Sequence, residues 1–89
     1  MKLKDNDELL EFLQILAEKA NSRGNRNLSI AIAYATEFYF GSATEFLRES
    51  QKSLQFALKE KWIWSLDEQK DISDVLVQIK DAFDMIGGA

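Results

Sequence analysis

Apolar residues recur every three or four positions along most of this chain, which is the pattern of a helix with one buried face. Three segments show it clearly: residues 5–22, residues 42–61 and residues 65–86. The most regular stripe belongs to the last segment and consists of Ile72, Val75, Leu76, Ile79, Ala82, Phe83 and Ile86. The pattern therefore predicts three amphipathic helices.

The segment LSIAIAYATEFYF, residues 28–40, fits two patterns. Large apolar residues alternate from Leu28 to Tyr34, as in a strand, but on a helical wheel apolar side chains cover almost the whole circumference. The segment is longer than a usual strand of about 5–6 residues, and its alanines favour a helix. No other segment offers a convincing partner strand. We therefore predict a helix over residues 28–40.

Residues with turn or capping preferences separate these segments. Gly24 and Gly41 can end helices, and two more glycines, Gly87 and Gly88, follow the last stripe. The residues that can cap helix starts are Asp5, Asn27, Ser42, and Ser65 or Asp67. Short connections favour antiparallel neighbours. The sequence predicts one all-α domain over residues 1–89, a small antiparallel up-down bundle of four helices, or three if the second and third merge at Gly41.

The chain carries more apolar surface than such a bundle buries easily. A helix that is apolar all round must be covered all round, and Phe56 and Ile63 point away from the main stripe of the third helix. We expect this surplus to be covered by a second copy in a homodimer or by another protein. The alternative is that the monomer itself buries these side chains. The candidate interface residues are Tyr34, Phe38, Phe56, Ile63 and Trp64.

Two absent residue types narrow the chemistry of the chain. The sequence has no cysteine and no histidine, which removes thiolate and imidazole ligands, nucleophile–histidine pairs and thiol redox switching. Carboxylate and lysine chemistry remain open. We expect a non-enzymatic protein with no catalytic residues, no metal site and no cofactor.

The charge balance limits the partners. The net charge is −4 and the isoelectric point is near 4.7, whereas phosphate-backbone binding needs clustered lysine and arginine. The longest apolar segment is too short to span a membrane, so we expect a soluble, cytoplasmic protein that binds neither nucleic acid nor membranes. Residues 67–86 carry six acids and two lysines. An immunity- or antitoxin-like inhibitor whose acidic fourth helix meets a basic partner is one specific hypothesis.

Glu37 suggests the rival function. It lies in the apolar segment, three residues after Tyr34, and a buried carboxylate can anchor a ligand. The alternative to a protein-binding role is thus a small-molecule-binding bundle with Glu37 as the polar anchor and a pocket among Tyr34, Phe38, Phe40 and Trp62. The simpler interpretation of Glu37 is that it lies on the one exposed strip of its helix.

Overall fold

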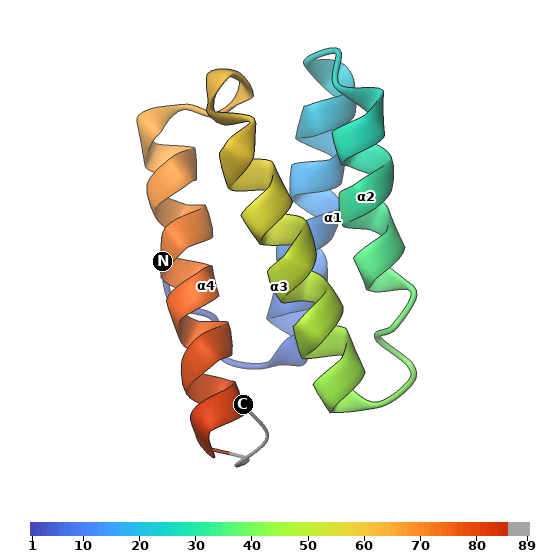
Figure 1. The fold of residues 1–89 in the computed structure, drawn as a ribbon, viewed down its shortest axis with the longest axis vertical. Coiled ribbons are helices and arrows are strands. Elements are labelled where there is room, and N and C mark those ends of the chain that lie inside the picture. Colours follow the sequence, from blue (N-terminus) through green and yellow to red (C-terminus); the bar gives the residue numbers. More distant parts are fainter. Residues whose placement is uncertain (86–89) are drawn as a thin grey trace.

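The computed structural model describes residues 1–85, which form four α-helices and one short 3₁₀ helix (Figure 1). The elements are α1 (Asn6–Ser22), α2 (Arg26–Thr36), α3 (Ala43–Lys59), η1 (Lys61–Ile63) and α4 (Leu66–Met85). The predicted all-α fold with four helices is confirmed, and α2 and α3 remain separate. The predicted end of the last helix at Ile86, and the two glycines after it, lie outside the described residues.

Successive helices run in opposite directions, as expected for an up-down bundle (Figure 1). In the figure, α1 and α3 run upward while α2 and α4 run downward. The main packing contacts join α1 to α2, α2 to α3 and α3 to α4. Each helix thus packs mainly on its neighbours in sequence. The helices α2 and α3 lie side by side, and each has one further helix as its other main neighbour, α1 for α2 and α4 for α3.

Side chains cap the helix starts as the sequence indicates, with one correction. Asp5 Oδ1 accepts from the Glu8 backbone N–H at 3.0 Å, and Ser42 Oγ accepts from the Glu45 N–H at 3.4 Å. The cap of α2 is Asn25 instead of the predicted Asn27, because Gly24 takes a left-handed φ of 88° and α2 starts two residues earlier.

The helix predicted over residues 28–40 ends at Thr36. From Glu37 to Tyr39 each backbone N–H donates to the carbonyl three residues earlier, a tighter turn than the α-helix makes. This turn lets the Tyr39 ring pack edge-on against Phe46, 5.5 Å between centroids, while its hydroxyl donates to Asp7 Oδ1 on α1. Tertiary contacts therefore end α2 a full turn before the apolar pattern does.

The core forms one continuous cluster that draws on every helix. Leu13, Leu28, Ile32, Phe46, Leu54, Ile72 and Val75 are its largest fully buried apolar side chains. Their spacing within each helix follows the predicted stripes. The Ser50 and Ser53 hydroxyls on α3 are also buried, and each donates to a backbone carbonyl of the preceding turn. In residues 1–85 no fully buried side-chain polar atom lacks a hydrogen-bond partner.

Trp62 does not face inward as the spacing indicates, and the structure buries Trp64, whose position the spacing leaves open. Extending the α3 stripe predicts that Trp62 faces inward, but α3 ends at Lys59 and η1 rotates the chain. Trp64 is 4% exposed and donates from Nε1 to the Ala57 carbonyl at 3.0 Å, whereas Trp62 is 70% exposed. Ile63 is buried as well. The predicted interface role of Ile63 and Trp64 is therefore wrong for the folded monomer, because both belong to its core.

Glu68 ties α1 to the start of α4. Its carboxylate accepts two hydrogen bonds from Arg23, at 2.6 and 3.0 Å, and one from Lys19 Nζ at 3.0 Å. Glu68 and Ser65 also cap one another reciprocally. The hydrogen bonds from Arg23 are the main cause that holds the pKa of Glu68 well below its ordinary value of 4.5. Lys19 and Arg23, at the end of α1, thus both pair with Glu68 at the start of α4.

We expect the unfolding free energy of the Glu68→Gln variant to fall less than that of wild type as the pH is lowered from 7 to 3. A carboxyl whose folded-state pKa is lowered contributes stability above its unfolded pKa, and that contribution is lost as pH falls below about 5. At pH 7 the variant should lose about 1–2 kcal/mol of unfolding free energy, the usual range for hydrogen bonds to a charged group near the surface. Urea titrations from pH 7 to pH 3 measure this difference.

Glu18→Gln is the matched control, since Glu18 is exposed on α1. The difference between wild type and Glu68→Gln should shrink steadily below pH 5, while Glu18→Gln should follow the wild-type profile. A Glu68→Gln difference that stays constant down to pH 3 would contradict the linkage.

Candidate functional site

An open groove of about 410 Å³ lies between α2 and α3. It is lined by Asn27, Ile30, Ala31, Tyr34, Glu49, Lys52, Ser53 and Phe56. The large apolar members face solvent: Ile30 is 57% exposed, Tyr34 53% and Phe56 40%. We refer to these lining residues as the α2/α3 groove. It is a surface on which exposed apolar side chains from two adjacent helices meet.

The helical repeat explains why α2 is apolar on both sides. Leu28, Ile32 and Ala35 lie at spacings of four and three and face the core. Ile30 and Tyr34 are four residues apart and lie about 160° from Ile32 on the wheel, so they must point outward. On α3, Phe56 lies about 100° around the helix from the buried Ala57, so it points away from the core. The sequence thus places a second apolar stripe on the outside of the bundle.

The turn after α2 extends the apolar surface. The Tyr34 and Phe38 rings meet edge-on, with centroids 5.2 Å apart and planes at 80°. Phe38 is half-buried and packs against the core cluster. Tyr34, Phe38 and Phe56, three of the five predicted interface residues, therefore lie in or beside the α2/α3 groove. Tyr34 is held by Phe38 from one side, which reduces the rotamer freedom that binding would have to remove.

Three polar side chains of the groove, those of Glu49, Lys52 and Ser53, have partners within α3. Lys52 Nζ lies 3.3 Å from Glu49 Oε2, and the Ser53 hydroxyl donates to the Ser50 carbonyl at 2.9 Å. The Lys52 side chain is 65% exposed and that of Glu49 21%. The groove offers an apolar floor with one ion pair at its rim.

Glu37 does not lie where a ligand anchor would need to be. It follows the last residue of α2 and its side chain is exposed, on the bundle exterior. It is not among the residues lining the α2/α3 groove. The burial of Glu37 that the small-molecule hypothesis assumed is wrong, because the side chain is exposed to water, and the binding role itself stays a prediction. The simpler interpretation, an exposed strip, is the one that the structure supports.

Spacing could have identified one groove residue that the candidate interface omits. Ile30 lies four residues before Tyr34 and eight before Phe38, so the three share one side of a continuous helix. Glu49 and Lys52 carried no signal in the sequence, because charged pairs at this spacing are common on any solvated helix.

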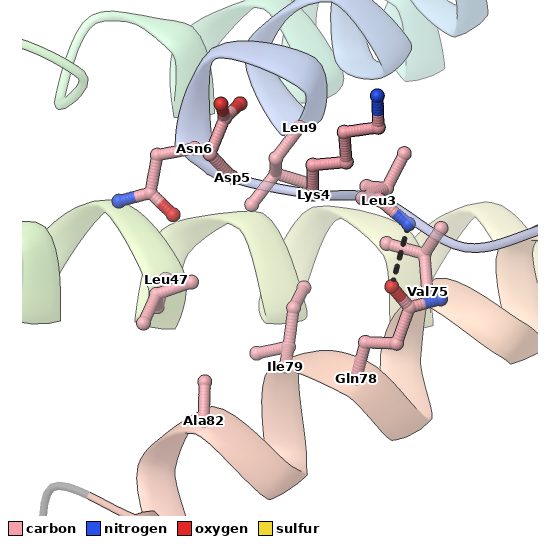
Figure 2. Close-up of a pocket in the computed structure, with 10 residues that line it drawn as sticks. All are labelled: Leu3, Lys4, Asp5, Asn6, Leu9, Leu47, Val75, Gln78, Ile79 and Ala82. Carbon is pink, nitrogen blue, oxygen red and sulfur yellow. Dashed lines mark hydrogen bonds between the residues drawn. The ribbon is translucent and has the colours of Figure 1, made fainter.

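A second, smaller hollow of about 160 Å³ lies where the N-terminal segment crosses α4. Figure 2 shows its aliphatic floor, with Leu47 from α3 and Ile79 and Ala82 from α4, beneath the start of α1. Gln78 holds the crossing segment in place: its Oε1 accepts from the Leu3 N–H at 2.8 Å and its Nε2 donates to the Met1 carbonyl at 2.9 Å. The Gln78 side chain thus holds the N-terminal segment against α4.

Part of the acidic charge of α4 has a structural role. Glu68 binds Arg23 and Lys19, and Asp74 pairs with Lys70 and with the N-terminal amino group, at 3.0 and 2.9 Å. These acids are engaged within the monomer. The immunity- or antitoxin-like role rested on the charge of this helix, and it stays a prediction.

No protein-family model matches the chain, and comparisons with curated proteins and with solved structures give no significant match. Within residues 1–85 no group of three or more acidic side chains is arranged to hold a metal ion. None of the helices described is both long and apolar enough to cross a membrane.

Proposed function

We propose that this protein is a non-enzymatic interaction protein that forms a homodimer through the α2/α3 groove. The observation that carries the proposal is the meeting of Ile30, Tyr34 and Phe56 on one solvent-facing surface of two adjacent helices. Trp62 and Phe40, which are more exposed, lie in the connections between helices, and the exposed Val77 and Ile15 lie on α4 and α1, outside the groove. An apolar face built on two packed helices is rigid enough to dock a partner with little loss of entropy.

The size of the apolar surface fits a dimer that dissociates on dilution. A large side chain presents about 150–250 Å², so three that are roughly half exposed leave about 300 Å² in contact with water. At ~25 cal/mol per Å², covering this area on both protomers yields about 15 kcal/mol. Association itself costs about 4–15 kcal/mol, so the net gain lies between about 0 and 11 kcal/mol, and the dimer should dissociate within a wide dilution series.

The paired rim favours binding over a reaction. Glu49 and Lys52 neutralise one another, and the Ser53 hydroxyl already donates to a carbonyl. The groove therefore presents apolar contact area and one neutral ion pair, which is the composition of a protein interface with an apolar centre and a polar rim.

The solution mass of wild type and of Ile30→Lys tests this proposal. The wild-type chain of 10.2 kDa should approach twice its own mass at the top of a concentration series from about 1 μM to 1 mM. Ile30→Lys places a charge in the centre of the groove of both protomers and should raise the dissociation constant about 100-fold or more. Light scattering after gel filtration measures both.

Val77→Lys is the matched control. Val77 is a β-branched residue on α4 with 59% of its side chain exposed, close to the exposure of Ile30, and it lies outside the groove. This variant should dimerise as wild type does. A wild-type chain that stays monomeric throughout the series would overturn the homodimer, and equal effects of the two lysines would overturn the choice of face.

A further inference from the structure

Resting on the proposed homodimer, we propose that the two copies are related by a twofold axis perpendicular to α3, so that Glu49 of each protomer faces Lys52 of the partner subunit. The rim ion pair of the monomer then becomes part of a cluster of four alternating charges. The four charges fix how the two copies are placed along α3. They also favour a partner whose rim carries one positive and one negative charge.

The sign and spacing of the rim charges carry this inference. Glu49 and Lys52 lie three residues apart on α3, both line the groove, and their charges are opposite. The groove lining is therefore electrically neutral, although the whole chain carries a net charge of −4. A second copy is a partner that this rim suits, because the surface is complementary in charge to itself.

Twofold symmetry allows two ways of laying the groove on its own copy. An axis parallel to the helices places α2 on the partner's α3, and then each rim charge meets the apolar side chains of α2. An axis perpendicular to the helices places α3 antiparallel to α3 of the partner, and an axis passing between Glu49 and Lys52 brings each opposite its counter-charge. The second arrangement avoids burying charges without opposite neighbours, which is costly.

The same axis also aligns the apolar residues of α2. α2 and α3 are antiparallel and their residues line the groove from Asn27 to Tyr34 and from Glu49 to Phe56. The level midway between Glu49 and Lys52 therefore corresponds on α2 to the level between Ile30 and Tyr34. Ile30 then packs against Tyr34 of the partner subunit, and the reverse contact follows from symmetry.

The area of the face fits a weak dimer. α3 has 17 residues and is about 25 Å long, α2 has 11 residues and is about 16 Å long, and each helix is about 10 Å wide. The face therefore covers about 400 Å² on each protomer and about 800 Å² in total, which is the size of a weak interface. An apolar centre of this size needs a favourable rim, which the four-charge cluster supplies.

Charge-reversal variants test the arrangement. Glu49→Lys makes the rim wholly positive and Lys52→Glu makes it wholly negative, so each variant alone should dimerise at least about tenfold more weakly than wild type. An equimolar mixture of the two should restore dimers, because a positive rim then meets a negative one. The double variant Glu49→Lys/Lys52→Glu should also restore them.

Sedimentation equilibrium gives the dissociation constants, and far-UV circular dichroism confirms that each variant is folded; both sites lie on the helix surface. Restoration in the mixture supports the arrangement. A wild-type dimer whose affinity is unchanged by either single reversal would overturn this arrangement and leave the proposed dimer face standing. A wild-type monomer would overturn the proposed function itself, so the two failures are distinguishable.

Discussion

Phe46→Ala should lower the free energy of unfolding by about 3–5 kcal/mol, the range for truncating a fully buried phenylalanine. Phe46 has no exposed surface, lies in the first turn of α3 and packs against the Tyr39 ring. The substitution removes contacts from the centre of the core and leaves a cavity that the surrounding helices fill only in part. A domain of this size has a total stability of about 5–10 kcal/mol, so most of it would be lost.

Phe40→Ala is the control for this prediction, because Phe40 is also a phenylalanine that contacts the Tyr39 ring, at 4.9 Å between centroids. Phe40 is 91% exposed, so its truncation should change the unfolding free energy by less than about 0.5 kcal/mol. Urea unfolding followed by circular dichroism at one fixed protein concentration measures both variants. Similar losses in the two would mean that the described burial of Phe46 is wrong.

Trp64→Ala should have an effect of the same size, about 3–5 kcal/mol. The buried indole fills the end of the bundle, donates from Nε1 to the Ala57 carbonyl and lies under the Arg23 guanidinium, 5.7 Å from the ring centroid. Its removal leaves a large cavity and takes from the Ala57 carbonyl one of its two donors, the other being the Glu60 N–H at 3.0 Å. Arg23 also loses a contact that orients it toward Glu68.

Trp62→Ala distinguishes the observed exposure of Trp62 from the inward position that helical spacing predicts for it. The exposed Trp62 donates from Nε1 to Glu60, and its truncation should cost less than about 1 kcal/mol. Fluorescence gives an independent check: the Trp62→Phe variant, which retains Trp64, should emit at shorter wavelength than Trp64→Phe. A larger loss of stability in Trp62→Ala than in Trp64→Ala would reverse the assignment.

Local chemistry made the helices predictable. The stripes in residues 5–22 and 65–86 fixed α1 and α4 to within a residue at each described end, because a helix with a buried face requires that repeat. Asp5 and Ser42 cap as predicted, since a side-chain oxygen needs only the adjacent free N–H groups to do so. The position of Asn25 shows the limit: which of two nearby asparagines caps α2 depends on the turn taken at Gly24.

The candidate site was only partly predictable. Tyr34 and Phe56 could be assigned to the outside because their spacing separates them from the core residues of their own helices. Ile63 and Trp64 could not be placed, since η1 changes the repeat after α3 and the helical wheel no longer applies. That Glu49 and Lys52 line an apolar groove could not be predicted, because this depends on which helix lies beside α3.

By itself, the sequence determined the helical class, four helical segments and an apolar surplus, because these follow from contacts within a turn or from the ratio of apolar to polar residues. Only the tertiary structure decided where α2 ends, which tryptophan is buried and that the surplus of α2 meets that of α3. These outcomes depend on packing between distant segments, such as Tyr39 on Phe46 and Arg23 on Glu68. The apolar repeat of one helix does not indicate which other helix packs against it, so these contacts form only in the assembled bundle.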